Sequence, residues 1–150
     1  MNGIDSIRIL DGNSYLVKNS SGVNRSDEAS FDEVYKSIGL DVSESLESIF
    51  NEASEKYKVN VNLLKAVAKA ESGFDANAES YCGAQGMMQL MPFVSEAYGV
   101  TDPFDAKQSI LTGARILSEH LDTFDGNATL ALAAYNAGAG SVSRYGGVPP

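Results

Sequence analysis

The sequence has only one cysteine, Cys82, and only one histidine, His120. A single cysteine excludes a disulfide within the chain. Neither residue belongs to an HExxH motif or a cysteine-rich spacing, so we predict no metal and no cofactor. A lone Cys with a lone His can suggest a nucleophile and its base, but no third group that would orient the base is evident. We therefore interpret Cys82 as a buried or loop thiol without a function and His120 as a residue on a helix surface.

Basic residues and long apolar runs are also scarce. Eleven Lys and Arg stand against 20 Asp and Glu, a formal net charge of −9 that argues against nucleic acid as a partner. No apolar run is long enough to span a bilayer, and the first thirty residues lack the basic start and apolar block of a secretory signal. Three explanations of that lack stay open: a cytoplasmic protein, a mature form numbered from its own start, and export by another route.

Composition divides the chain in two. Residues 1–30 are rich in Ser, Asn, Asp and Gly, and such a segment buries too little apolar surface to offset its ordering entropy. We predict a flexible leader over 1–40, with a short β-like piece at SYLV, residues 14–17. Helical patterns follow, no strand pair is evident after residue 31, and 150 residues suit one core. The prediction is a mainly α domain over 41–150.

Capping residues mark the expected helices. Asp41 and Glu44 have the spacing of a capping box before an apolar stripe that reaches Tyr57. Asn60 caps a second helix, which Gly73 ends. Further helices are expected from Pro92 to about Tyr98, from the capping-box pair Asp105 and Gln108 to Leu121, over residues 128–138 after Asn127, and as a turn over residues 142–145. Apolar residues on all sides of 128–138 predict a fully buried helix. Residues 76–86 form a predicted loop, and MMQLM, residues 87–91, a short helical piece.

The second expected helix carries a carboxylate on its apolar face. Glu71 follows Leu64 and Val67 by seven and four positions, so the three side chains share one face. Lost hydration raises the pKa of such a carboxyl, and the partial negative charge of the helix C-terminus acts in the same direction. A carboxylic acid still partly protonated near neutral pH is a general acid. The alternative is that Glu71 lies at the edge of the stripe, exposed or paired with Lys65 or Lys69.

A partner carboxylate for Glu71 is not evident. Glycosidases normally place a second carboxylate across the scissile bond, as nucleophile or base. Asp75 and Glu79 are the nearest in sequence, and both lie in a polar stretch without signs of burial. Chemistry with one acid–base group takes its nucleophile from the substrate itself.

Four short stretches carry a resemblance to a known family. ESGFDANAES, GAQGMMQLMP, ALAAYNAGAGSV and YGGVPP, in this order, resemble the soluble lytic transglycosylase domain of glycoside hydrolase family 23 type, from about residue 46 to the end. The resemblance implies a lysozyme-like fold with a substrate groove. It also implies cleavage of the β-1,4 bond between N-acetylmuramic acid and N-acetylglucosamine in peptidoglycan, with a 1,6-anhydromuramoyl product. Glu71 matches the single catalytic Glu, which acts first as acid and then as base.

The resemblance also implies substrate contacts. Ser80 matches a serine that hydrogen-bonds sugar near the cut, although a turn-forming serine explains it equally well from sequence alone. Gln89 and Met91 match residues that line the cleft. Tyr135 and Asn136 match the AYN motif, whose tyrosine is expected near the catalytic carboxylate, while a buried aromatic with a satisfied hydroxyl is the alternative. Weaker candidates for shaping the cleft are Ser72, Phe74 and Tyr145. Gly86 is expected to let the backbone approach the site closely. Met87 and Met88 are expected to pack mostly in the core.

Departures from the family keep other functions open. The family usually continues past GGVPP with a further helix, which we expect to be lacking here. A goose-type-lysozyme-like muramidase that uses water is one alternative, and a catalytically weak peptidoglycan-binding or secretion-assembly module is another. The expected partner is the peptidoglycan glycan strand, and the expected place is the cell wall, outside the inner membrane. A secretion, flagellar or phage assembly system is one expected route there, and the protein is expected to be a monomer.

Overall fold

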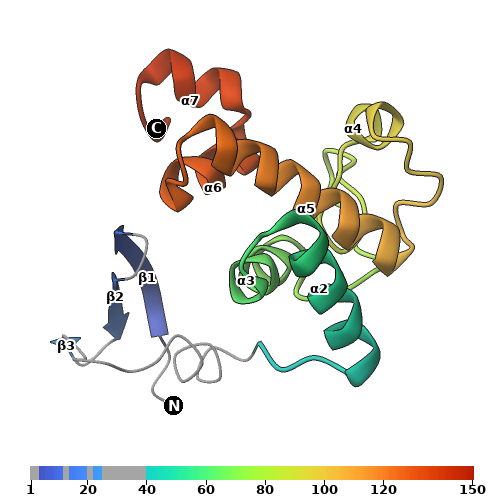
Figure 1. Ribbon diagram of the computed structural model, residues 1–150, viewed down its shortest axis with the longest axis horizontal. Helices are drawn as coiled ribbons and strands as arrows, with labels where there is room; N and C mark the ends of the chain where they lie inside the picture. Colours follow the sequence, from blue (N-terminus) through green and yellow to red (C-terminus); the bar gives the residue numbers. More distant parts are fainter. Residues whose placement is uncertain (1–3, 12–13, 20–21, 25–39) are drawn as a thin grey trace. The chain divides into compact units, whose positions relative to one another are not determined.

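The computed structural model describes residues 4–11, 14–19, 22–24 and 40–150 (Figure 1). Strands β1 (Ile4–Asp11), β2 (Ser14–Asn19) and β3 (Gly22–Asn24) form an antiparallel sheet in the order β1-β2-β3. β2 contains the predicted β-like piece, whereas β1 and β3 were not predicted, since their many polar residues hide a strand pattern. Residues 25–39 of the predicted leader lie outside the described residues, and the flexibility of the leader stays a prediction.

Helices make up most of residues 40–150, and the predicted mainly α fold is confirmed. They are α2 (Glu44–Tyr57), α3 (Val61–Ser72), α4 (Pro92–Ala97), α5 (Ala106–Thr123), α6 (Ala128–Ala137) and α7 (Ala139–Tyr145). Residues 40–118 form one compact unit and residues 119–150 belong to a second, so the boundary falls inside α5. The predicted division into a leader over 1–40 and a catalytic domain over 41–150 stays a prediction.

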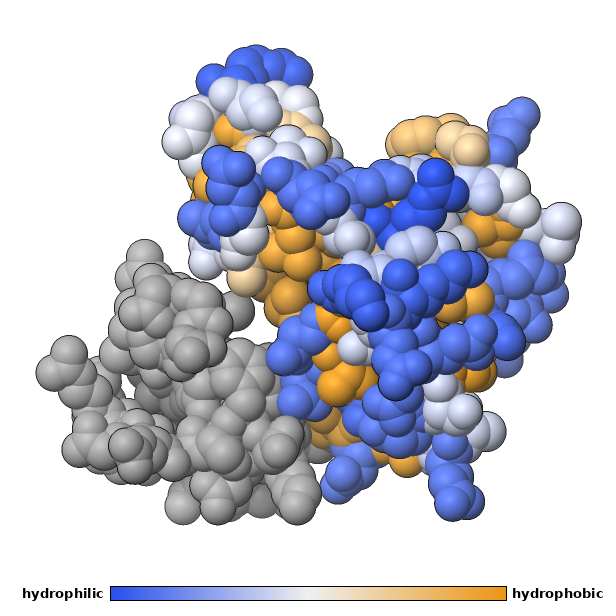
Figure 2. Space-filling view, viewed as in Figure 1, coloured by the Kyte–Doolittle hydropathy of each residue, from blue (hydrophilic) through white to orange (hydrophobic). Residues whose placement is uncertain are grey.

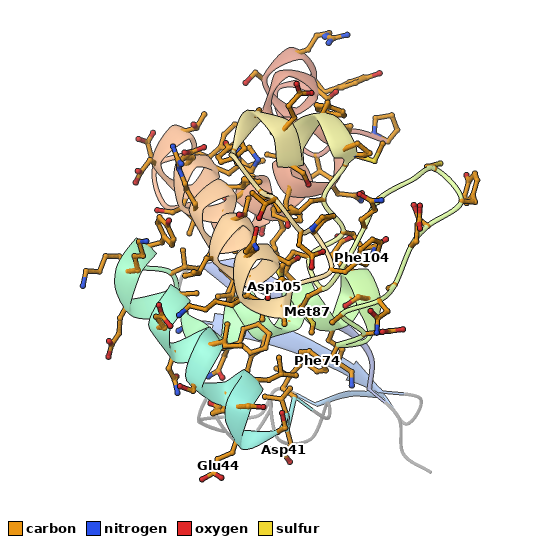
Figure 3. All side chains as sticks on the ribbon, turned by 90° about the vertical axis from the view of Figure 1, so that its right-hand side faces the viewer. Asp41, Glu44, Phe74, Met87, Phe104 and Asp105 are labelled. Atoms are coloured by element: carbon orange, nitrogen blue, oxygen red, sulfur yellow. The ribbon has the colours of Figure 1, made fainter. Side chains whose placement is uncertain are left out.

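Most helix ends follow the local signals of the sequence. The Asn60 side chain accepts hydrogen bonds from the amides of Asn62 and Leu63, and Gly73 ends α3 at a φ of +62°. Asn127 caps α6 through the Leu130 amide. Pro92 stands in the first turn of α4 and Asp105 precedes α5, as expected (Figure 3).

Two capping-box predictions are only partly right. Ser43, not Asp41, caps α2, by accepting a hydrogen bond from the Leu46 amide. At α5 the Asp105 carboxylate accepts from the Gln108 amide, as a cap does. The Gln108 side chain does not complete a box: its oxygen accepts instead from the amides of Thr101 and Asp102 and from the Thr101 hydroxyl.

Two helix predictions are wrong. Residues 87–91 form no helix, because Gly86 and Gln89 have positive φ values of +80° and +51° and close a tight turn. The chain then pairs Gln85 with Leu90 through two backbone hydrogen bonds. The α6 helix is not fully buried: its buried residues are Ala131 and Ala134, and Asn136 is exposed.

The unit of residues 40–118 has its core between α2, α3 and the first part of α5. Its fully buried side chains include Phe50 of α2, Leu64 of α3 and Ile110 of α5. Met87 and Met88 belong to this core, as predicted. Further buried members of this core are Ala53, Val59, Leu63, Val67, Ala68, Leu90, Ala114 and Leu117.

Polar contacts connect the helices of this unit. Lys65 of α3 is buried and forms an ion pair with Glu47 of α2. The Ser118 hydroxyl of α5 donates to the Tyr57 carbonyl at the end of α2, at 2.9 Å. In the second unit α6 packs on α7, where Val142 is buried. Within the described part of the chain, no helix has the length and apolar character needed to cross a bilayer.

Candidate active site

The α3 helix places Glu71 one residue before its end. Val67 and Ala68 are buried, and Glu71, four and three residues later, is half-buried. Gly73 takes the left-handed conformation that stops the helix. Glu71 therefore lies where the buried stripe of α3 meets the loop that follows it.

Partial burial sets the electrostatics of Glu71. Burial raises the pKa of its carboxyl above the ordinary value, the direction expected from the sequence. Pairing with Lys65 does not occur, because that ammonium is held by Glu47. The ammonium of Lys69 lies 5.7 Å from the centre of the Phe74 ring (Figure 3 labels Phe74). Within residues 40–150 no ion pair holds Glu71, so its acid form is favoured by lost hydration without an opposing cation.

The residue after Glu71 connects α3 to the turn at 86–89. The Ser72 hydroxyl lies 2.8 Å from the Met87 carbonyl oxygen and 3.0 Å from that of Ala68, so both oxygens compete for its single proton. The bond to Met87 spans fifteen residues of sequence and fixes the end of α3 against the turn. Sequence reasoning named Ser72 only as a weak candidate, and no local signal indicates this contact.

The turn at 86–89 holds the Gln89 amide in one orientation. Its Nε2 donates to the carbonyl oxygens of Ala78, at 3.2 Å, and Gly86, at 2.9 Å. These two bonds use both amide protons, so the side-chain oxygen remains as the group that can accept from a ligand. Gln89 is a non-glycine residue at a φ of +51°, a conformation that persists only where surrounding contacts enforce it.

Ser80 shapes the loop between α3 and this turn. Its hydroxyl oxygen accepts from the Ala84 amide at 3.0 Å, its own amide donates to the Ala84 carbonyl, and its carbonyl accepts from the Gly83 amide. Ser80 therefore stabilises a turn, one of the two roles that the sequence left open. The hydroxyl proton is not used in that bond, so Ser80 can still donate to a ligand.

Two contacts hold the turn at 86–89 in place, one made by α5 and one by the segment before α5. The Met88 amide donates to the Ser109 hydroxyl oxygen, at 3.0 Å, and Ser109 is fully buried. Gly86 faces the Pro103 carbonyl, whose oxygen would lie 1.9 Å from an added Cβ. Sequence reasoning overlooked Ser109, although its spacing of four and eight residues from Gly113 and Leu117 places it on the buried face of α5.

The remaining predicted residues divide between the two units. Met91 precedes α4 and is half-buried, in the same unit as Glu71, Ser80 and Gln89. Tyr135, half-buried, and Asn136, exposed, lie on α6 in the second unit. Their approach to Glu71 stays a prediction, as does a role for Tyr145, which is exposed.

Other reactive side chains of the described residues do not form a second centre. Asp75 and Glu79 are both exposed, as the sequence indicates. Cys82 is an exposed free thiol, and burial lowers the pKa of His120. No group of three His, Cys, Asp or Glu side chains is placed to hold a metal in the described residues. A half-buried carboxylic acid beside a fixed turn can donate a proton to a bound ligand and take one back.

Comparisons with known proteins show which proteins this chain resembles. A family model described as the transglycosylase SLT domain matches residues 48–148. A transglycosylase of Enterobacteria phage PRD1 is 40% identical over 86 residues, 57% of this chain and 32% of the relative. Membrane-bound lytic murein transglycosylase F 2 of Alkalilimnicola ehrlichii is 40% identical over 98 residues, 61% of this chain and 22% of the relative.

Solved structures show the same fold. The lytic transglycosylase Slt of Pseudomonas aeruginosa, solved as an inactive glutamate-to-glutamine mutant, has a TM-score of 0.63 at 28% identity, over 78% of this chain and 20% of that one. The 70-kDa soluble lytic transglycosylase of Escherichia coli has a TM-score of 0.63 at 22% identity, over 75% of this chain and 19% of that one. This chain thus spans a third or less of the relatives it matches.

Proposed function

Because the chain belongs to the transglycosylase SLT domain family, we propose that it is a lytic transglycosylase of bacterial peptidoglycan. The proposed reaction cleaves the β-1,4 bond between N-acetylmuramic acid and N-acetylglucosamine and leaves a 1,6-anhydromuramoyl end. The observation that carries the proposal is the half-buried carboxyl of Glu71, with its raised pKa, inside the matched residues. Relatives named as lytic murein transglycosylases support the choice of substrate.

Glu71 serves both halves of the proposed reaction. As acid, it gives its proton to the glycosidic oxygen while the bond from that oxygen to the anomeric carbon breaks. As base, the resulting carboxylate takes the proton of the muramic acid 6-hydroxyl, whose oxygen bonds to the anomeric carbon. Glu71 ends in its starting protonation state. A tethered hydroxyl competes well with water, since effective molarities of well-oriented groups reach about 10⁵–10⁸ M.

The surroundings of Glu71 favour one carboxylate over two. Hydrolysis with inversion or retention uses a second carboxyl within about 5–9.5 Å of the first, facing the same bond. The nearest carboxylates in sequence, Asp75 and Glu79, are exposed. The Asp75 carboxylate accepts a hydrogen bond from the Asn77 amide in a local turn. Neither side chain is therefore part of a buried site that could shield a second reacting group from water.

We propose that Ser80, Gln89 and Met91, which lie in the same unit as Glu71, bind sugar. Gln89 would accept from an N–H or O–H group through its side-chain oxygen, because its amide protons are used by Ala78 and Gly86. Ser80 would donate its free hydroxyl proton, and Met91 would pack against an apolar sugar face. Tyr135 and Asn136 are proposed to contribute from α6.

Product analysis tests the proposed function. Digestion of purified cell walls is expected to release muropeptides with 1,6-anhydromuramoyl ends, because the intramolecular attack excludes water. Mass spectrometry identifies them, since each is one water lighter than a reducing-end product. Reducing muramic ends from the earliest time point would favour a goose-type muramidase, and intact walls would favour a binding or assembly module.

The activity is expected to fall as the pH rises. Glu71 must be protonated to act as acid, and its pKa is raised, so the loss of activity should follow a titration above the ordinary carboxyl value of 4.5. The measurement is kcat/KM against pH with soluble glycan fragments, with circular dichroism at each pH as the control for folding. A flat profile well into the alkaline range would contradict the role of Glu71 as acid.

The proposed substrate places the working protein at the cell wall, outside the inner membrane. The phage relative supports a phage assembly context as one proposed setting. Secretion and flagellar systems are further proposed settings. The proposed form is a monomer, because a glycan strand needs only one groove.

A further inference from the structure

The loop after α3 presents a bare aromatic ring. Tyr81 is fully exposed, at 103% of its reference surface, against 69% for Phe93 and 63% for Tyr145. The ring therefore contributes no burial to folding. Figure 3 shows the loop of residues 76–86 reaching out from the helices of its unit. Single exposed apolar residues are common on proteins, so exposure needs a second observation before it indicates binding.

Hydrogen bonds hold the backbone turn in which Tyr81 lies. The Ser80 amide donates to the Ala84 carbonyl and the Ser80 carbonyl accepts from the Gly83 amide, both at 2.9 Å, and the Ser80 hydroxyl oxygen accepts from the Ala84 amide. Gly83, at a φ of +90°, allows the tight turn. None of these bonds involves the Tyr81 side chain, so they fix the backbone from which the ring projects and do not depend on the ring. Such preorganisation lowers the entropic cost of binding.

The base of the same loop is connected to the catalytic helix. The carbonyl oxygen of Ala78 accepts from the Gly86 amide at 2.8 Å and from the Gln89 side chain at 3.2 Å. The neighbouring carbonyl of Met87 accepts from Ser72, the residue after Glu71. Hydrogen bonds thus fix the end of α3 to the turn at 86–89, and the same turn to the base of the loop that carries Ser80 and Tyr81.

We propose that Tyr81 is a stacking platform for a sugar ring of the glycan strand, one contact beyond Ser80. This inference rests on the proposed function. The C–H face of a pyranose is apolar and packs on a flat aromatic ring, and the phenol hydroxyl remains free for a polar group at the edge of the sugar. The occupant is the carbohydrate rather than a stem peptide, because Tyr81 carries no charge to pair with one.

Kinetics separate this contact from the chemistry. Tyr81→Ser is expected to raise KM for glycan strands freed of stem peptides by about 2- to 10-fold, the range that aromatic contacts give, with kcat unchanged. Tyr81→Phe keeps the ring and should stay close to wild type. Phe93→Ser is the matched control, because it removes another exposed aromatic ring, on α4, where Figure 2 shows an apolar patch. Its KM is expected to be unchanged. An unchanged KM for Tyr81→Ser would overturn the inference.

Fluorescence tests the contact directly, because the chain contains no tryptophan. Tyr81→Trp in a Glu71→Gln background gives a single exposed reporter on a protein that does not consume its ligand. Peptide-free glycan strands should shift its emission to shorter wavelength and saturate, whereas Phe93→Trp in the same background should not respond. Binding without a shift, an equal shift at both positions, or a shift that only free stem peptide produces would overturn the inference. Absence of anhydro products from the wild type would instead overturn the proposed function, since the fluorescence experiment needs no catalysis.

Discussion

Replacing Glu71 with glutamine is expected to lower kcat by about 10³-fold or more, because a positioned acid–base group contributes about 10²–10⁴-fold and Glu71 is proposed to act in both steps. Glutamine keeps the size and polarity of the protonated acid but can neither give nor take the proton. The measurement is the clearance of purified cell walls, with quantification of anhydromuramoyl ends. Similar clearance by both proteins would end the assignment of Glu71 as catalytic.

The same substitution should not destabilise the fold. A carboxyl whose pKa is raised in the folded protein binds more protons there than in the unfolded chain, so its contribution to stability is present at low pH. That contribution is lost as the pH rises from the unfolded pKa through the folded one. Above the folded pKa the charged carboxylate is therefore unfavourable, and Glu71→Gln should have an unchanged or higher Tm there. A large drop in Tm would indicate that lost activity reflects unfolding.

An exposed carboxylate of the next loop provides the matched control. Glu79→Gln makes the same chemical change eight residues further on. The Glu79 side chain is exposed and forms no ion pair within the described part of the chain. Wild-type activity is expected, because one carboxylate suffices for the proposed reaction. A loss comparable with that of Glu71→Gln would point to a second catalytic carboxylate and therefore to hydrolysis.

Local chemistry explains why several helix ends were predictable from the sequence. Asn60 caps α3 through amides two and three residues away, and Gly73 ends it by its own backbone conformation, so both signals lie within a few residues. The position of Glu71 at the end of the buried face follows from the helical spacing that it shares with Leu64 and Val67. These features need no knowledge of distant contacts.

Contacts distant in sequence explain what the sequence did not reveal. Lys65 is buried because Glu47, eighteen residues earlier, neutralises it. The turn at 86–89 replaces the predicted helical piece because Met88 is held by Ser109 and Gln89 by Ala78. No local pattern announces such partners, and intrinsic helix preference is overridden by them. The family resemblance implied a substrate contact at Gln89 without showing why its backbone bends.

Replacing Gly86 with alanine is expected to be among the most damaging single changes in this unit. An added Cβ would stand 1.9 Å from the Pro103 carbonyl oxygen and 3.1 Å from its carbon, both backbone atoms that cannot rotate away. The φ of +80° adds conformational strain for any residue with a Cβ. We expect a loss of about 3–5 kcal/mol in the free energy of unfolding, the range of severe single substitutions. Chemical denaturation monitored by circular dichroism measures it.

A second glycine separates the collision from the backbone strain. Gly83 has a φ of +90°, but nothing lies within 4 Å of its added Cβ. Gly83→Ala should therefore show only the conformational cost, about 1–2 kcal/mol. The difference between the two variants measures the close approach of Pro103 to the turn that carries Gln89. Equal losses would mean that the Pro103 segment moves aside easily, and the turn would then not be the fixed support that the proposed role of Gln89 requires.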